Sequence, residues 1–300
     1  MADRRFAGLL EIGAASKELG SGANRGEPER TRLFITPMDS PVDSGDFNLS
    51  FRAAETDADR ARENRRWLRF VVGRPVSCLH QVHSARVLDL DQVLEGAVFG
   101  DGDALAERLV PLQDEEADGQ VTVRRDVALA AFSADCTPVA FVDEQDGVFG
   151  TCHSGRRGTE QNIVGAVVDA MLSKGAHAAN ISCWIGPHIC GNCYETGEKI
   201  ADAFAQRFPD VPGAAVLTRF GGPGIDIGAA IAAELRQAGV PMEHIHTSDD
   251  GFVRECGKRT GRTDFMAFCT LENPLLYSYR EYTLTSRPRC NGRFALVLVP

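Results

Sequence analysis

Residues 127–153 read VALAAFSADCTPVAFVDEQDGVFGTCH and contain three apolar runs. The apolar run Val127–Ala134 is suited to a buried strand. Two further apolar runs, 138–143 and 147–153, are separated by the turn-like residues 144–146,. These two runs therefore predict a β-hairpin.

The predicted hairpin brings one cysteine and one histidine together. A turn centred on residues 144–147 places Pro138 opposite His153, and Cys136 is two residues along the same strand. Because side chains alternate between the two faces of a strand, Cys136 and His153 become diagonal neighbours on one face, about 7 Å or less apart at Cβ. A slip of one residue would put them on opposite faces. In the predicted register they can share one metal ion or one proton.

Helical and strand patterns surround this hairpin without a regular alternation. Residues 159–174 carry an apolar stripe at helical spacing, with Thr159 as the predicted N-cap and Gly175 as the stop,. The other predicted elements are a charged helix over 57–70, a strand over 75–90, an acidic irregular segment over 101–125, a helix over 226–238 and a final strand over 293–299,. This mixture favours an α+β fold over a doubly wound sheet.

Length and composition indicate one catalytic domain with an N-terminal extension. The chain has 300 residues, of which 43% are hydrophobic and 25% charged, enough to bury a sizeable core,. Residues 20–30, GSGANRGEPER, are typical of a tail or linker,. We therefore divide the chain into an N-terminal tail or appendage, 1–32, and a catalytic domain, 33–300.

The composition also excludes classes of partner. The net charge of −10 repels nucleic acids and anionic membranes, and no stretch approaches the ~20 apolar residues of a membrane span,. Residues 1–20 lack the apolar core of a signal peptide, so a cytoplasmic protein is expected. Nine cysteines, an odd number, indicate thiols or metal ligands in place of a disulfide framework,.

Cysteine and histidine at the hairpin suggest a zinc site. A thiolate and a neutral imidazole bind zinc at about 2.0 to 2.3 Å, and three protein ligands leave open the fourth position that a catalytic zinc site requires. Spacing does not identify the third ligand among the seven histidines. The alternative for each histidine is an ordinary surface or core role.

Two further motifs carry chemistry. Arg156 and Arg157 stand where the chain enters the predicted helix and would favour an anion, although both can equally be solvated surface charges. Cys190 and Cys193 have the spacing of a redox or metal pair, but they follow Gly186-Pro187 in a predicted loop, and the alternative is two loop thiols,. No Rossmann or Walker fingerprint supports a nucleotide cofactor.

Several segments resemble, in order and approximate separation, those of one known family. They are Leu79–His83 (LHQVH), Ala134–Pro138 (ADCTP), His153–Gly158 (HSGRRG), Phe47–Ser50, Asn64-Arg65, Ala117–Gly119, Ile185–Pro187 with Cys193–Glu195, the 226–238 helix, and Tyr277–Arg280 with Gly292-Arg293. Through them the chain is similar to the laccase-domain family. That family was first described as multicopper polyphenol oxidases and later as purine nucleoside phosphorylases with adenosine deaminase and methylthioadenosine phosphorylase activity.

The resemblance implies a layered α/β/β/α sandwich similar to the cysteine hydrolase-like fold. It implies a metal held by His83, Cys136 and His153. The ligand types make Zn²⁺ the expected ion and Cu²⁺ the other candidate. The resemblance also implies phosphorolysis of adenosine, inosine and methylthioadenosine together with adenosine deamination. Purine nucleoside and phosphate are then the expected partners of a monomer or homodimer. The chain departs from the family at Arg156, where the family has tryptophan, and over residues 34–45, where its glycine-rich segment is not recognisable.

Candidate residues divide into catalytic and substrate-binding roles. Cys136, His153 and Asp135 are the catalytic candidates, whereas Asn48, Gln81 and Arg157 are the substrate-binding ones. Within the second group, Arg157 and Asn48 form the predicted phosphate side. A zinc ion would lower the pKa of a water molecule toward ~7, which permits attack on C6 of adenosine.

Three alternatives use the same residues differently. The first is a metal-free hydrolase with Cys136 as nucleophile, His153 as base and Asp135 as the group that orients the base. Polyphenol oxidase chemistry is weaker, since one His-Cys-His cluster cannot bind several copper ions. The third is a non-enzymatic binding module with a structural zinc, although structural sites usually carry four protein ligands.

Overall fold

Two β-sheets form the centre of the protein. A computed structural model describes residues 8–15, 30–40, 45–51, 57–98, 102–247, 249–287 and 291–300. The five-stranded sheet has the order β1 (Leu10–Ala15), β2 (Thr31–Ile35), β13 (Phe294–Val299), β6 (Ala128–Ser133) and β3 (Val76–Ser77). The six-stranded sheet has the order β12 (Ile245–His246), β9 (Ser182–Ile185), β7 (Thr137–Asp143), β8 (Val148–Ser154), β5 (Gly119–Thr122) and β4 (Val87–Asp89). Both sheets mix parallel and antiparallel pairs.

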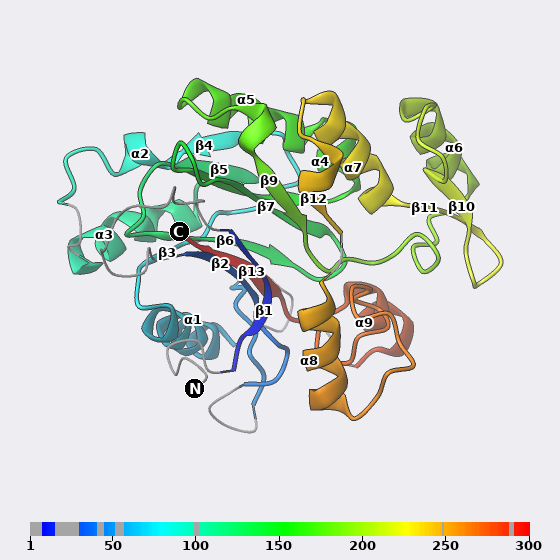
Figure 1. Ribbon diagram of the computed structural model, residues 1–300. Helices are drawn as coiled ribbons and strands as arrows, with labels where there is room; N and C mark the ends of the chain where they lie inside the picture. The colour runs from blue at the N-terminus through cyan, green and yellow to red at the C-terminus, as the bar shows by residue number, and fades with distance from the viewer. Residues whose placement is uncertain are drawn as a thin grey trace.

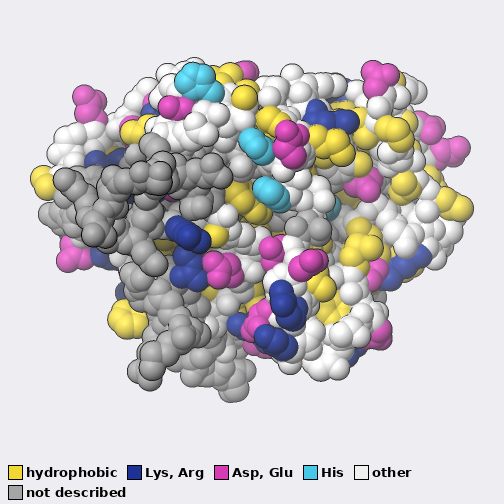
Figure 2. Space-filling model, in the orientation of Figure 1, with side chains coloured by type: hydrophobic (Ala, Val, Ile, Leu, Met, Phe, Trp, Pro, Cys, Tyr) yellow, Lys and Arg dark blue, Asp and Glu magenta, His cyan; other side chains and the backbone are white. Residues whose placement is uncertain are grey.

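Helices cover the outer faces of the two sheets (Figure 1). The described helices are α1 (Ala58–Val72), α2 (Leu90–Val93), α3 (Gly102–Leu109), α4 (Arg156–Glu160), α5 (Ile163–Ser173), α6 (Glu198–Arg207), α7 (Ile227–Gln237), α8 (Asp250–Thr260) and α9 (Tyr279–Thr285), and a small sheet pairs β10 (Ala215–Leu217) with β11 (Pro223–Ile225). Among the residues described, no helix has both the length and the apolar character needed to cross a membrane. On the face shown in Figure 2, acidic and basic side chains are interspersed.

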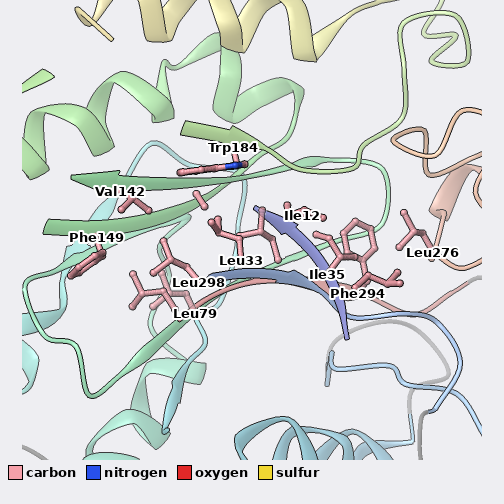
Figure 3. Close-up of a cluster of buried hydrophobic side chains, with 14 of the residues drawn as sticks. Ile12, Leu33, Ile35, Leu79, Val142, Phe149, Trp184, Leu276, Phe294 and Leu298 are labelled. Carbon is pink, nitrogen blue, oxygen red and sulfur yellow. The ribbon is translucent and has the colours of Figure 1, made fainter. Parts of the chain in front are cut away.

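Three apolar cores separate these layers. Between the two sheets, Leu33 and Leu298 from one sheet pack with Phe149 and Trp184 from the other (Figure 3). A second core lies between the six-stranded sheet and helices α5 and α7, and a third lies between the five-stranded sheet and α1. The predicted α+β class is confirmed, with several mixed sheets.

The predicted hairpin is confirmed with its register. Strands β7 and β8 pair antiparallel, and Pro138 lies opposite His153. Asp143 fixes the turn, because its Oδ1 accepts hydrogen bonds from the backbone N–H groups of Gln145 and Asp146, both at 3.1 Å. Gly147 follows with a φ of 70°, a left-handed conformation that glycine adopts without strain,.

Two stretches near the hairpin differ from the sequence-based expectation. The strand predicted over 75–90 is two short strands, β3 and β4, joined by a loop, because the alternation is interrupted where His80 forms an isolated bridge to Glu116. The segment 101–125, predicted to be irregular, contains α3 and the fully buried strand β5. The acidic composition of this segment had suggested an irregular structure, and so neither α3 nor β5 was predicted.

Helix boundaries agree with prediction except at one N-cap. Helix α1 begins after Asp57 and α7 after Asp226, and both aspartates accept hydrogen bonds from backbone N–H groups of the first turn. Helix α5 is capped by Asn162, not by Thr159, because Asn162 has a φ of 59° and interrupts the helical path. The Thr159 hydroxyl instead bonds Ser154 Oγ at 2.8 Å.

Part of the predicted appendage belongs to the first sheet. Residues 10–15 form β1, which pairs antiparallel with β2. A Cβ atom on Gly13 would lie 2.2 Å from Trp184 Nε1, so the strand packs closely against the opposite sheet. Most of the polar run 20–30, namely 20–29, lies outside the described residues. The eight described cysteines are free thiols.

Glu234 on α7 is a buried acid whose carboxylate oxygens have no hydrogen-bond partner among the described residues. Arg207 lies close to it, with 3.9 Å between Nη2 and Oε1. Burial outweighs that cation and raises the pKa of Glu234 from 4.5 to about 8,. The folded protein therefore holds the proton more tightly than the unfolded chain does.

This proton linkage predicts a loss of stability toward alkaline pH. The contribution is complete below the unfolded pKa of 4.5 and disappears as the pH rises through about 8,. A shift of this size corresponds to on the order of 4 kcal/mol. We expect the free energy of unfolding in urea to fall by roughly that amount between pH 5 and pH 9. It should fall less in Glu234→Gln. Parallel pH profiles for the two proteins would contradict the assignment.

Candidate functional site

A cavity of about 420 Å³ opens beside the end of the hairpin. His83, Cys136 and His153 line part of it, and Tyr279 and Arg293 approach from the C-terminal segment. This volume is in the range that holds a small-molecule ligand.

His83, Cys136 and His153 form a cluster within the cavity wall. The ligand atoms that the three side chains offer all lie within 4.8 Å of one another. Cys136 Sγ is 3.7 Å from His83 Nε2, and the two imidazole rings meet edge to face with centroids 4.8 Å apart. The structure thus brings together the three residues predicted to hold a metal.

Each member of the cluster lies near the end of a strand or in a connection between the two sheets. His153 is near the end of β8, and Cys136 lies in the short connection from β6, in one sheet, to β7, in the other. His83 lies in the loop between β3 and β4, with a left-handed φ of 64°. Gly155 leaves room for the cluster, because a Cβ atom there would lie 2.7 Å from Cys136 Sγ.

Asp118 holds the cluster from behind. Its buried carboxylate accepts hydrogen bonds from the backbone N–H groups of residues 82–84, at 2.7 to 3.1 Å, and from the Ser84 hydroxyl at 2.8 Å. It also bonds His153 Nδ1 at 2.9 Å. Nε2 is therefore the ring nitrogen that His153 can offer to a ligand. Asp118 lies in the segment Ala117–Gly119 that resembles the family, but no local sequence pattern indicates this role.

The electrostatics of the cluster favour separated charges. Burial raises the pKa of the Cys136 thiol, but His153 and His83 outweigh burial and lower it to about 6,. Burial lowers the pKa of His153, yet the Cys136 thiolate and the Asp118 carboxylate raise it to about 9. Burial likewise raises the pKa of Asp118, but its hydrogen bonds to His153 and Ser84 bring it to about 2. The two shifts together favour a Cys136 thiolate beside a protonated His153 over two neutral side chains.

Asp135, the predicted orienting acid, lies on the other side of Cys136. Its carboxylate accepts hydrogen bonds from Thr270 Oγ1 at 2.7 Å and from the Arg280 backbone N–H at 2.6 Å. Burial raises its pKa. Its φ of 98° is rare for a residue other than glycine, so these bonds hold a strained turn that aims Cys136,. The carboxylate beside His153 is that of Asp118 instead.

The three predicted substrate-binding residues occupy different places. Gln81 lines the cavity, and its amide exchanges two hydrogen bonds, at 2.8 and 2.7 Å, with the backbone of Phe132. Asn48 is buried, and its Oδ1 accepts from the backbone N–H groups of Ser50 and Arg293. Arg157 is exposed and is not one of the residues that line the cavity.

Two arginines that the sequence analysis did not select line the cavity. The Arg293 guanidinium lies 5.8 Å from the centroid of the Tyr279 ring. The Arg65 guanidinium stacks on Phe51, 3.9 Å from the ring centroid, and its Nε donates to the Leu49 carbonyl at 2.7 Å. Arg156, at the predicted anion site, pairs with Glu160 at 2.7 Å. The cations that face the cavity therefore come from α1 and the C-terminal segment.

Together, the fold and this cluster define an α+β protein with a His-Cys-His site in a cavity next to two facing sheets. Residues 39–299 match the family model described as multi-copper polyphenol oxidoreductase laccase. The chain belongs to this family.

Curated relatives and solved structures agree with that membership. A protein named purine nucleoside phosphorylase from Mycobacterium bovis is 32% identical over 80% of this chain and 82% of its own length. Another of that name, ORF3 from Streptomyces griseus, is 36% identical over 59% of this chain and 61% of its own length. Adenosine deaminase RL5, from an unknown prokaryotic organism, is 32% identical over 61% and 71%.

Two solved structures share the fold across most of the chain. YlmD from Geobacillus stearothermophilus has a TM-score of 0.68 at 24% identity and covers 90% of this chain and 91% of its own. The Neisseria meningitidis protein NMB0706 has a TM-score of 0.67 at 23% identity and covers 97% and 98%.

Proposed function

We propose that this protein is a metal-dependent enzyme of purine nucleosides, which phosphorolyses adenosine, inosine or methylthioadenosine and deaminates adenosine. The observation that carries the proposal is the cluster of His83, Cys136 and His153 in the wall of a nucleoside-sized cavity. The names of the relatives from Mycobacterium bovis and Streptomyces griseus, and of RL5, support the substrate class.

The donor set fits one divalent ion, with zinc as our first choice and copper as the second. Two imidazoles and one thiolate are typical zinc ligands, and the hydrogen bond from His153 to Asp118 is the support that metal-binding histidines usually have,. When bound, zinc would act as a Lewis acid and lower the pKa of a water molecule toward ~7. Metal binding would displace the proton that His153 otherwise holds.

The residues of the chain supply orientation and charge. Asp118 keeps Nε2 of His153 directed at Cys136, and Asp135 fixes the turn from which Cys136 projects. Tyr279 and Phe51 offer flat apolar surfaces to a purine ring,. In phosphorolysis, a phosphate oxygen bonds to C1′ of the ribose while the bond from C1′ to the purine breaks. We assign the phosphate to Arg293, whose backbone Asn48 holds.

Replacing Arg293 with alanine tests this assignment against the predicted phosphate ligand Arg157. Loss of a charge-assisted hydrogen bond costs about 1.5–3 kcal/mol, so Arg293→Ala should raise the phosphate KM roughly 10- to 100-fold and change the nucleoside KM less. Arg157→Ala is the matched control and should change both little. A larger phosphate effect in Arg157→Ala would move the phosphate to the start of α4, and equal effects of Arg293→Ala on both KM values would remove Arg293 from the site.

The product profile from adenosine tests the function itself. The purified protein is incubated with adenosine, with and without phosphate, and the products are separated by chromatography. Adenine that requires phosphate is expected of a phosphorylase, and inosine formed without phosphate is expected of a deaminase. If neither forms while metal is bound stoichiometrically, the purine assignment is wrong.

A metal-free cysteine hydrolase is the second candidate, favoured by one observation. Cys136, His153 and Asp118 are arranged as nucleophile, base and orienting acid, and the thiol has a pKa lowered to about 6,. The similarity to the cysteine hydrolase-like fold predicted from sequence belongs with this candidate. Activity that survives complete removal of metal by a chelator would favour it, whereas activity restored only by added zinc would exclude it.

A further inference from the structure

Three thiols and one carboxylate gather at a second point, separate from the cavity. Cys190, Cys193, Cys269 and Glu272 offer ligand atoms that all lie within 4.8 Å of one another. We call these four residues the cysteine tetrad. No member of the tetrad lines the cavity beside Cys136.

The tetrad is assembled from two tight turns. Two residues separate Cys190 from Cys193, and two separate Cys269 from Glu272. The Cys190 carbonyl accepts hydrogen bonds from the N–H groups of Cys193 and Tyr194, at 2.9 and 3.0 Å, and the Cys269 carbonyl accepts one from the N–H of Glu272 at 3.1 Å. An isolated bridge from His188 to Cys269 holds the turns together. Each turn therefore presents two donor atoms to the same point.

The spacing of the donors suits a tetrahedral ion. A zinc–sulfur bond of about 2.3 Å places neighbouring ligand atoms about 3.8 Å apart. Cys193 Sγ and Glu272 Oε1 are already 3.4 Å apart, and the others need to move by at most about an ångström,. Cys-x-x-Cys is the usual spacing of a zinc-binding turn.

The tetrad combines buried thiols with one paired carboxylate, so the convergence of the donor atoms is what favours a cation. Cys193 and Cys269 are fully buried with Ile189 and pack against Leu271, yet the Glu272 carboxylate reaches the same apolar cluster. The Glu272 carboxylate also accepts hydrogen bonds from the Met266 backbone N–H at 3.0 Å and from the Cys193 thiol at 3.4 Å. Arg219 bonds Glu272 Oε1 at 3.0 Å, from a side chain that is 40% exposed.

We propose that the cysteine tetrad is a second metal site that takes a thiophilic divalent cation, with zinc as the principal candidate. Four protein ligands close the coordination sphere, which makes the site structural. It is distinct from the cluster of His83, Cys136 and His153 and does not depend on the proposed nucleoside chemistry.

A metal at the tetrad would also position Cys136. Ile189, next to Cys190, donates its backbone N–H to the Asp135 carbonyl at 2.9 Å, and Thr270, next to Cys269, donates its hydroxyl to the Asp135 carboxylate at 2.7 Å. An ion that joins the two turns therefore fixes Ile189 and Thr270, the two residues that hydrogen-bond to the strained Asp135. Emptying the tetrad should loosen this turn.

Metal counting and cobalt spectroscopy on the full-length protein test the proposal. Zinc bound per chain is measured by mass spectrometry in the unchanged protein, in Cys136→Ala with His153→Ala, and in Cys193→Ser with Cys269→Ser. We expect Cys136→Ala with His153→Ala to retain about one equivalent of zinc, bound at the tetrad. Cys193→Ser with Cys269→Ser should lose this equivalent. After cobalt exchange, strong thiolate-to-cobalt absorption should persist in Cys136→Ala, because the tetrad supplies three sulfurs.

Thiol protection in the unchanged protein avoids variants that fail to fold. Maleimide labelling followed by peptide mapping should modify Cys190 slowly in zinc-loaded protein and much faster after chelation, while Cys78, a buried thiol outside both clusters, is unaffected. The proposal fails if Cys136→Ala loses all thiolate-to-cobalt absorption, or if a disulfide within the tetrad is recovered from metal-loaded protein. Metal loss confined to the Cys136 and His153 variant would overturn the second site and leave the first intact.

Discussion

Replacing Cys136 with alanine should abolish turnover of adenosine while leaving the protein folded. The thiolate is the anionic donor of the His-Cys-His cluster and the partner of both imidazoles. We expect kcat/KM to fall on the order of 10³-fold, which corresponds to about 4 kcal/mol of transition-state stabilisation. Steady-state kinetics of the purified variant, together with its metal content, provides the measurement.

Cys78→Ala is the matched control, since it removes another free thiol, one that does not line the cavity. It should retain activity, and both variants should melt within a few degrees of the unchanged protein. Wholesale unfolding of Cys136→Ala would indicate that the cluster is structural. Retained turnover in Cys136→Ala would exclude it from catalysis.

Replacing Asp118 with asparagine should reduce both stability and metal affinity. The carboxylate accepts from three backbone N–H groups, one hydroxyl and His153, whereas an amide would turn an NH₂ group toward some of these donors. Breaking a buried charge network of this kind costs about 3–5 kcal/mol. Loss of the group that supports a metal-binding histidine lowers metal affinity about 10- to 100-fold.

Urea unfolding and competition with a chelating dye measure the two effects of Asp118→Asn. Asp210→Asn, at an exposed aspartate, makes the same chemical change and should alter neither quantity appreciably. If Asp118→Asn and Asp210→Asn lose equal stability, the hydrogen bonds around Asp118 do not stabilise the loop that contains His83.

The hairpin was predictable because its determinants are local. A short turn and a two-residue alternation fix which side chains share a face, and these alone placed Cys136 near His153,. His83 was not predictable from spacing, because it reaches the cluster from a loop whose shape depends on Asp118, 35 residues further on. The family resemblance supplied it instead.

The residues that sequence analysis missed act across long separations. Arg293 lies just before β13, and its backbone N–H donates to Asn48 Oδ1, 245 residues away. Half of the cysteine tetrad was visible as Cys190 and Cys193, but Glu272 meets Cys193 from 79 residues away. The acidic residues around α3 suggested an irregular segment, and no local pattern showed that α4 would end before Asn162 and α5 begin after it.

The position of the cluster relative to the two sheets has a mechanical consequence. Cys136 lies in the connection from β6 to β7 and His83 in that from β3 to β4, so both connections pass from the five-stranded sheet to the six-stranded one. His153 belongs to the six-stranded sheet alone. Sliding one sheet over the other would pull the three donors out of alignment before any strand came apart. An ion bound by all three would resist sliding of one sheet over the other. The geometry of the site would then change before the hydrogen bonds between strands break.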